Sequence, residues 1–188
     1  QTDGTGFTNL YSFTADVDGA IPDAGLILSG GILYGTTASG YSGSGSVFAL
    51  HTDGSGFTNL YDFSPTDPDT GTNSDGASPQ STLILAGNVL YGTAAYGGTN
   101  GNGTVFAINT DGSNFTNLYT FGAFGNYGPN SDGAIPQAGL ILSGNLLYGT
   151  ASYGGDAGDG TVFAIKTDGS GFTNLFSFNR AVNSIGAN

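Results

Sequence analysis

Oxygen-bearing side chains that could bind a hard cation alternate along one stretch of the sequence. Asp67, Asp69, Asn73 and Asp75 alternate with other residues, with Gly71 at the remaining alternate position, and Gly76 follows Asp75 directly. This order resembles the first half of a calcium-binding loop, although the bidentate Glu that such a loop needs is absent. The same residues also form turns through side-chain-to-backbone hydrogen bonds. The sequence therefore leaves two interpretations, a structural turn, which is favoured, and a calcium site, and calcium is the one candidate cofactor.

Side chains suited to catalysis are few. His51 is the single histidine, and the equivalent residues in the other units are Asn109 and Lys166. A position that accepts all three side chains is best interpreted as the solvent-exposed end of a strand. Without Cys, the chain has no thiol nucleophile and no zinc–thiolate site. Paired Asp carboxylates could cleave glycosides, but the repeated Asp residues all fall in predicted turns. We therefore predict that the protein is not an enzyme.

Aromatic side chains are the other candidate for a site. At repeated positions they are best explained by packing between sheets, and stacking on sugar rings is the alternative. Aromatic residues outside the complete units, or in loops that do not repeat, are better placed to contact a partner. The predicted partner-binding residues are Phe7, Tyr11, Phe13, Tyr41, Phe124 and Tyr127.

The charge balance narrows the classes of partner. All fourteen acidic residues are Asp, against two basic residues, and the formal net charge is -12 at pH 7. Nucleic-acid phosphates and anionic membrane surfaces require Lys and Arg, so both are excluded. No apolar run approaches the roughly 20 residues that span a bilayer as a helix. Cations, neutral polymers such as glycans, and further copies of the chain remain as candidate partners.

The residues discussed so far belong to a tandem repeat, which is the strongest pattern in the sequence. Leu-Tyr-Gly-Thr occurs three times at equal spacing, and an Asp-Gly-Ala precedes each copy. Thr-Asp-Gly-x-x-Phe-Thr-Asn-Leu occurs four times, with its Asp at Asp3, Asp53, Asp111 and Asp168. The spacing of this second motif varies, so the differences in length lie in loops.

Each unit predicts four short antiparallel strands and no helix. In the last unit they fall at residues 139–143, 146–151, 161–166 and 172–178, separated by Gly-rich turns. Four such strands describe a propeller blade, and the unit is longer than most solenoid repeats, which are the main alternative. The predicted fold class is all-β, a β-propeller-like array of four-stranded antiparallel blades with three complete blades plus one spare outer strand.

The predicted blades divide the chain into seven segments. Residues 1–21 hold the spare outer strand of an incomplete blade and its linker, and the chain stops where a further repeat is expected. Blade 1 covers residues 22–63, blade 2 residues 79–121 and blade 3 residues 136–178, while residues 64–78, 122–135 and 179–188 are linkers.

The amino-acid sequence of the repeat unit resembles that of a known family. Leu-Tyr-Gly-Thr, the Gly-Gly loop, Gly-Thr-Val-Phe and Phe-Thr-Asn-Leu-Tyr-x-Phe are similar to the tandem GloVer repeat of bacterial surface proteins, over residues 2 to 178. In that family the repeats often precede a sorting or anchoring signal. The resemblance implies an exported protein that is extracellular or at the cell surface, and it brings no catalytic residues with it.

Three functions follow as hypotheses. The first is a structural or adhesive repeat protein that assembles with copies of itself, or with further repeats of the same chain, as a fibre or surface layer. The second is a glycan-binding propeller that uses loop aromatics, Asp and Asn, with or without calcium. The third and weakest is a hydrolase that uses Asp residues of the connecting loops.

Overall fold

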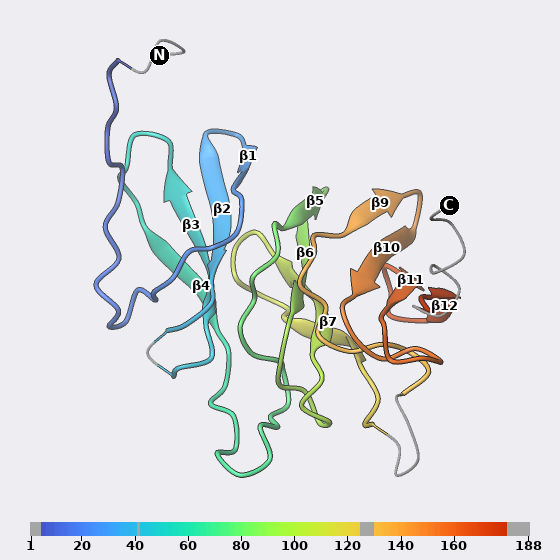
Figure 1. The fold of residues 1–188 in the computed structure, drawn as a ribbon. Coiled ribbons are helices and arrows are strands. Elements are labelled where there is room, and N and C mark those ends of the chain that lie inside the picture. Colours follow the sequence, from blue (N-terminus) through green and yellow to red (C-terminus); the bar gives the residue numbers. More distant parts are fainter. Residues whose placement is uncertain (1–4, 41, 125–129, 180–188) are drawn as a thin grey trace, which may run out of the picture.

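The protein folds as three β-sheets that lie side by side. The structure is a computed structural model that describes residues 5–40, 42–124 and 130–179. Within these ranges the chain forms twelve strands in three four-stranded antiparallel sheets, and no helix is long and apolar enough to cross a membrane (Figure 1). The arrangement confirms the predicted all-β, β-propeller-like array of three complete blades.

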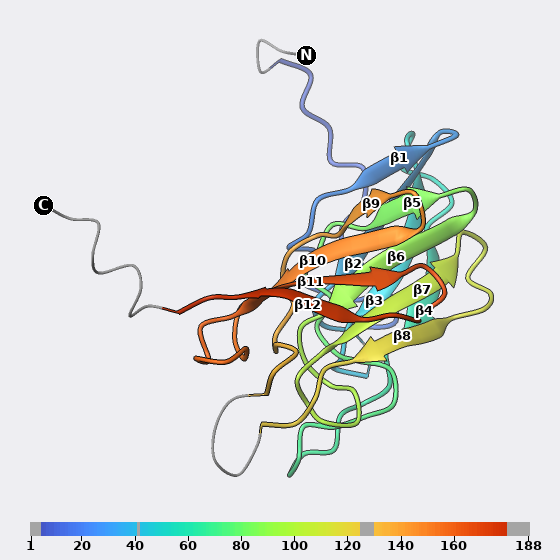
Figure 2. The same cartoon turned by 90° about the vertical axis from the view of Figure 1, so that its right-hand side faces the viewer.

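Each blade follows the chain from one strand to its neighbour. Blade 1 has the order β1-β2-β3-β4, blade 2 β5-β6-β7-β8 and blade 3 β9-β10-β11-β12. The bounds are β1 (Ile27–Ser29), β2 (Ile32–Thr37), β3 (Ser46–His51), β4 (Thr58–Asp62), β5 (Ile84–Ala86), β6 (Val89–Ala94), β7 (Thr104–Asn109), β8 (Thr116–Thr120), β9 (Ile141–Ser143), β10 (Leu146–Ala151), β11 (Thr161–Lys166) and β12 (Thr173–Ser177). Figure 2 shows the short strands β1, β5 and β9 along one edge of the array and β4, β8 and β12 toward the other.

Strand alternation gives every blade two apolar faces, which we name after their main residues. The tyrosine face of blade 1 packs on the leucine face of blade 2, and the same contact joins blades 2 and 3. The first interface buries Tyr34, Val47, Ala49 and Phe63 against Leu83, Leu90, Ala94, Phe106 and Ile108. The second buries Tyr91, Val105, Ala107 and Phe121 against Leu140, Leu147, Ala151, Phe163 and Ile165. The core of the protein is therefore a pair of equivalent interfaces between blades.

The glycine of Leu-Tyr-Gly-Thr is required by this packing. A Cβ on Gly92 would lie 2.6 Å from Cζ of Phe106 and 2.8 Å from Cδ2 of Leu83, and Gly149 is equally close to Phe163. The missing side chain lets the phenylalanine of the next strand lie across the middle of the sheet. The repeated motif thus encodes a slot in the leucine face.

The links between blades are fixed by backbone hydrogen bonds. The amide of Ser78 donates to the carbonyl of Ser44 at 2.8 Å, and that of Ile135 donates to the carbonyl of Asn102 at 2.9 Å. Both linker residues have a positive φ, 54° and 57°, although each precedes a proline and one is β-branched. Such a backbone is strained, and it persists where the surrounding contacts determine it. The entry of the chain into each new blade is therefore set by the preceding one.

Two sequence expectations differ in detail. The first strand of blade 3 was expected at residues 139–143 but begins at Ile141, because only Ile141, Leu142 and Ser143 pair with β10. The segment Phe7 to Phe13 forms no strand hydrogen bonds within the described residues. It packs on blade 1 through the rings of Tyr11 and Phe13 and through the backbone of Leu10, which lies against Gly54.

We predict that Gly92→Ala destabilises the fold by about 1–3 kcal/mol, the usual cost of overpacking a core. Gly40→Ala is the matched control, since a Cβ there meets its nearest neighbour at 3.5 Å, an ordinary contact, and its effect should stay within about 0.5 kcal/mol. Urea unfolding followed by circular dichroism measures both. Equal effects of the two substitutions would contradict the slot in the leucine face.

Candidate interaction site

An aromatic clasp joins each blade to the next. Near the end of β4, Tyr61 stacks on Phe115 with ring centroids 3.8 Å apart and planes at 2°. Phe63 meets Phe106 edge-on at 5.3 Å and also touches Phe115. We call this unit, a Tyr and a Phe two positions later packed on two Phe of the following blade, the aromatic clasp. It supplies large apolar contact with defined geometry.

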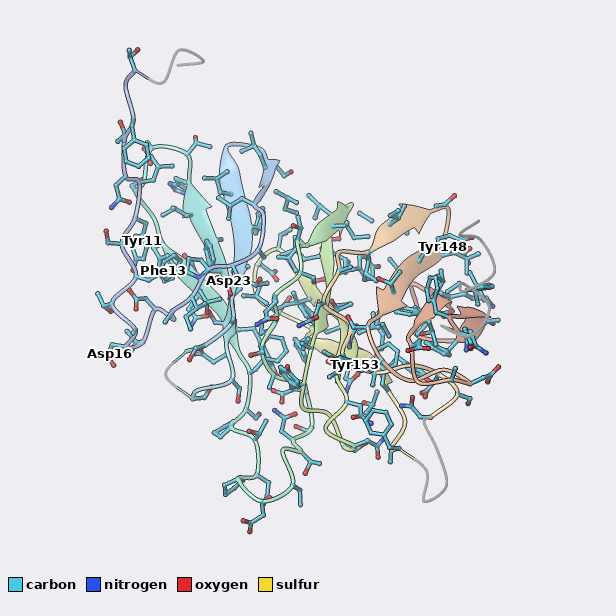
Figure 3. All side chains as sticks on the ribbon, in the orientation of Figure 1. Tyr11, Phe13, Asp16, Asp23, Tyr148 and Tyr153 are labelled. Carbon is cyan, nitrogen blue, oxygen red and sulfur yellow. The ribbon has the colours of Figure 1, made fainter. Side chains whose placement is uncertain are left out.

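The clasp recurs at the other two junctions. Tyr119 stacks on Phe172 at 3.8 Å and 3°, with Phe121 set edge-on to Phe163 at 5.3 Å. In the N-terminal segment, Tyr11 stacks on Phe57 at 4.3 Å and 7°, and Phe13 meets Phe48 at 5.2 Å. Figure 3 shows Tyr11 and Phe13 beside blade 1. The segment before blade 1 thus makes the contact that an outer strand makes elsewhere.

The tyrosine of each clasp also bonds the aspartate of the following Asp-Gly-Ala. The hydroxyl of Tyr61 donates to Oδ2 of Asp75 at 2.8 Å, and the amide of Ser64 donates to the same oxygen at 2.9 Å. Tyr119 donates to Asp132 at 2.6 Å and Tyr11 to Asp18 at 3.0 Å. These aspartates therefore hold the linker against the strand that precedes it, and we call this Tyr–Asp hydrogen bond the latch.

The electrostatics of the latch suit a structural role. Burial, together with the neighbouring carboxylate, raises the pKa of the Tyr61 and Tyr119 hydroxyls well above the usual range. Burial alone would raise the pKa of Asp18, but hydrogen bonds from Thr14 and Tyr11 outweigh it and lower that pKa. A protonated phenol beside an ionised carboxylate is a stable donor–acceptor pair at neutral pH, and it holds the linker without moving a proton.

The raised tyrosine pKa predicts a loss of stability at alkaline pH. Above about pH 10 the unfolded chain releases phenol protons that the folded protein keeps, so the free energy of unfolding falls as the pH rises. The variant Tyr61→Phe/Tyr119→Phe should be less stable at pH 7, by about 1–3 kcal/mol for each lost bond to a carboxylate. Its stability should fall less steeply above pH 10. Urea unfolding across a pH series measures both, and equal slopes for the variant and the parent would contradict the latch.

The residues of the predicted calcium loop bond to their own neighbours. Oδ1 of Asp67 accepts from the amide and the hydroxyl of Thr70, each at 2.8 Å. Oδ1 of Asn73 accepts from the amides of Gly76 and Gly98. Asp75 belongs to the latch, and Asp69 is exposed. In the described part of the chain no group of three or more His, Cys, Asp or Glu could hold a metal ion. These contacts support the turn interpretation.

We expect calcium to leave the stability of the protein unchanged, since Oδ1 of Asp67, Oδ1 of Asn73 and Oδ2 of Asp75 already accept hydrogen bonds. Thermal unfolding in excess calcium and in excess chelator should give the same midpoint. Asp67→Ala should lower the midpoint equally in both conditions, because it removes the acceptor of the turn. A midpoint that rises with calcium in the parent protein but not in this variant would restore the calcium site.

The aromatic residues predicted to bind a partner are separated in the structure. Tyr11 and Phe13 lie together on blade 1, half-buried, whereas Phe7 is 91% exposed. Phe124 is exposed in the linker that follows β8. Tyr41 and Tyr127 lie outside the described residues. The structure thus brings together one pair of this set.

Sequence reasoning did not identify the two faces, one at each end of the array, that no other blade covers within the described residues. Phe178 is 41% exposed, although its equivalents Phe63 and Phe121 are fully buried. On blade 1, Leu26 is 51% exposed, against 1% for Leu83. The signal was present in the motif, because the fourth copy of the clasp has Phe176 where the others have Tyr.

The surface has two hollows, one at blade 1 and one at blade 3. One, of about 310 Å³, lies between the N-terminal segment and the leucine face of blade 1, with Leu26, Leu33 and Phe48 in its lining. The other, of about 610 Å³, lies beside β12 and is lined in part by Asp132, Asp156, Asn174 and Phe176. The first is mostly apolar in its lining residues, and the second combines an exposed ring with carboxylates.

Comparison with known proteins agrees with the repeat. Residues 1–129 match the family described as the Gloeobacter/Verrucomicrobia repeat, which confirms the GloVer-type resemblance. No protein of curated function has a matching sequence.

Similar solved structures have low sequence identity to this chain. A chain of the nidogen/laminin complex has a TM-score of 0.50 and 16% identity, over 79% of this chain and 45% of that one. A family 117 glycoside hydrolase from Zobellia galactanivorans has a TM-score of 0.48 and 15% identity, over 90% and 59%. TolB from Acinetobacter baumannii has a TM-score of 0.48 and 12% identity, over 86% and 32%. The chain thus spans less than two thirds of each of these proteins, and the likeness concerns the fold alone.

Proposed function

The chain belongs to the Gloeobacter/Verrucomicrobia repeat family, and from this premise we propose that it is an extracellular structural or adhesive protein whose blades also pack between chains. Its role is assembly through shape and apolar contact, and it has no catalytic step. The partner is a further copy of the chain or a further repeat of the same type.

The observation that carries this proposal is the tyrosine face of blade 3, which no blade covers within the described residues. This face has the residue types that the next blade covers in blades 1 and 2. Tyr148, Val162, Ala164 and Phe178 repeat Tyr34, Val47, Ala49 and Phe63 position for position. Ile141 on the same face is 69% exposed. A face with the composition of a buried interface favours a blade as its partner.

The opposite end of the array offers the complementary face. The leucine face of blade 1 carries Leu33, Phe48 and Leu50, which match Leu90, Phe106 and Ile108 of the first buried interface. Figure 3 shows Tyr148 at the end of the array away from Tyr11. Contact between unlike ends is head-to-tail, and such contacts form filaments when they do not close into a ring.

The charge of the protein sets the conditions for assembly. With a net charge of -12, copies repel one another at low ionic strength. The blade faces themselves are apolar, so salt screens the repulsion without weakening the contact. Added salt should therefore strengthen association.

We predict concentration-dependent association that increases with salt, measured by sedimentation velocity and by electron microscopy. Val162→Asp, which places a charge on the tyrosine face of blade 3, should weaken association by at least about tenfold, equivalent to about 1.4 kcal/mol. Phe124→Asp adds the same charge in a linker and should leave association unchanged. A parent protein that stays monomeric at every concentration and salt would refute the proposal.

A glycan-binding role is the second candidate, and the hollow beside β12 favours it. Phe176 is 58% exposed there, next to the carboxylates of Asp132 and Asp156. An exposed ring with nearby polar groups is the usual surface for a neutral sugar. A glycan array followed by calorimetry tests this role, and binding that is lost in both Phe176→Ala and Asp156→Ala would support it.

A further inference from the structure

Two exposed tyrosines occupy the same place in blades 2 and 3. Tyr96 follows β6 and Tyr153 follows β10, and their side chains are 45% and 53% exposed. Tyr96 interrupts the stretch 90–98, in which every other residue is buried. Blade 2 packs against a neighbouring blade on both of its faces, so the exposure of Tyr96 is a property of its own position and not of an uncovered face.

Reciprocal backbone hydrogen bonds fix the position of both tyrosines. The amide of Tyr96 donates to the carbonyl of Ala77 at 2.9 Å, and the amide of Ala77 donates to the carbonyl of Tyr96 at 2.7 Å. Tyr153 exchanges the same two bonds with Ala134, at 3.0 and 2.8 Å. Each tyrosine is thus tied to the linker that enters its blade. An aromatic side chain on such a preorganised backbone loses little conformational freedom when it binds a ligand.

Blade 1 has the same backbone frame without the ring. Ser39 exchanges hydrogen bonds with Ala20 at 3.1 and 2.8 Å, as the tyrosines do with their partners. The frame therefore forms without an aromatic side chain, and the fold does not explain why Tyr96 and Tyr153 carry one. A ring that the fold does not require, held in place and exposed to solvent, suits contact with a ligand.

Uncharged polar side chains connect the segment of Tyr153 to blade 2. The hydroxyl of Ser152, the residue before Tyr153, donates to Oε1 of Gln137 at 3.3 Å. Nε2 of Gln137 donates to Oε1 of Gln80 at 3.4 Å. Each glutamine has two N–H donors and one carbonyl acceptor, more than these bonds use. The seam between blades 2 and 3 therefore offers donors and acceptors that suit hydroxyl groups.

The chemistry of this surface selects one class of partner. A sugar stacks on an aromatic ring through its apolar face and bonds amides through its hydroxyls. A protein partner would cover roughly 800 Å² of continuous surface, whereas the two rings stand apart among Gly, Ser and Gln. The net charge of -12 repels anionic polymers. A neutral polysaccharide fits all three conditions.

We propose that Tyr96 and Tyr153 are two platforms of one surface that binds a neutral polysaccharide, whose chain runs across the blades from ring to ring. Stacked sheets lie about 10 Å apart, so one polymer reaches both rings, and the second contact forms at high effective concentration. Figure 3 shows Tyr153 toward the middle of the array, whereas Tyr148 lies at its end. The ligand class is that of the second candidate function, but the site is separate from the hollow beside β12 and requires no association between chains.

Affinity electrophoresis of the whole chain tests the proposal, in gels that contain hydroxyethyl cellulose, galactomannan or dextran. At least one of these neutral polymers should retard the parent protein, and the anionic carboxymethyl cellulose should not. Tyr96→Ala and Tyr153→Ala should each weaken binding by at least about fivefold, because stacking and avidity are both lost, and the double variant should not bind. Tyr96→Phe should bind like the parent, since stacking does not need the hydroxyl. Phe124→Ala removes an exposed ring elsewhere and should change nothing.

A gain of binding is the sharper test. Ser39→Tyr places a third ring on the matching frame of blade 1, and it should strengthen binding by about threefold or more through added avidity. This substitution removes no contact of the other two platforms. A surface that bound sugars without using this position would gain nothing from it.

The outcomes separate this site from the other candidates. Absence of retardation by all three neutral polymers refutes the inference. So does binding that survives in the double variant, and binding lost in Phe176→Ala but not in Tyr96→Ala would assign the ligand to the hollow beside β12. Unfolding followed by circular dichroism shows whether each variant is folded, and Ser39→Tyr decides the matter if the alanine variants are not. Self-association enters none of these measurements, so the proposed structural function stands or fails independently.

Discussion

The structure depends on the fact that each four-stranded sheet has two apolar faces and can bury neither alone. A blade is one sheet thick, so Tyr34 and Leu90 can leave water only if two blades meet. The glycines of Leu-Tyr-Gly-Thr, the clasp rings and the strained linker residues all serve that contact. Stability in such an array is a sum over neighbours, so a blade with one uncovered face contributes less than a blade with two covered faces.

The aspartate of the Asp-Gly-Ala motif positions the linker by accepting hydrogen bonds. Asp75 is buried, and it accepts hydrogen bonds from Tyr61 and Ser64 where a cation could have compensated its charge. The phenol and the carboxylate meet only when the outer strand of one blade and the linker to the next are both in place. The latch therefore couples the order of the linker to the docking of the blade that follows it.

Much of the fold could be predicted from the sequence because its determinants are local. Strand alternation, together with the Gly-Asn turn before β10, predicts the bounds of β10 and β11 to the residue. The Asp168-Gly169 turn before β12 is equally local. The faces could not be assigned, because Leu147 and Tyr148 are both apolar and alternation does not say which neighbour each will meet. The hydrogen bond from Tyr61 to Asp75 could not be predicted either, because Tyr61 belongs to the preceding strand β4 and the contact is not local in sequence. The loop containing Asp67 was open to two interpretations because carboxylates suit turns and calcium alike.

The junctions also bear on how such a gene can change. Every clasp and every latch connects a unit to its immediate successor, and none reaches past it among the described residues. A duplication or deletion that spans one whole period therefore regenerates an intact junction at the splice. An insertion within the linker after Phe63 or Phe121 leaves both flanking clasps untouched, whereas a shift of one residue inside a strand would exchange its two faces. The array can thus change length in whole periods, and vary freely only in the part of each linker between the clasp and the aspartate of the latch, without a compensating substitution elsewhere.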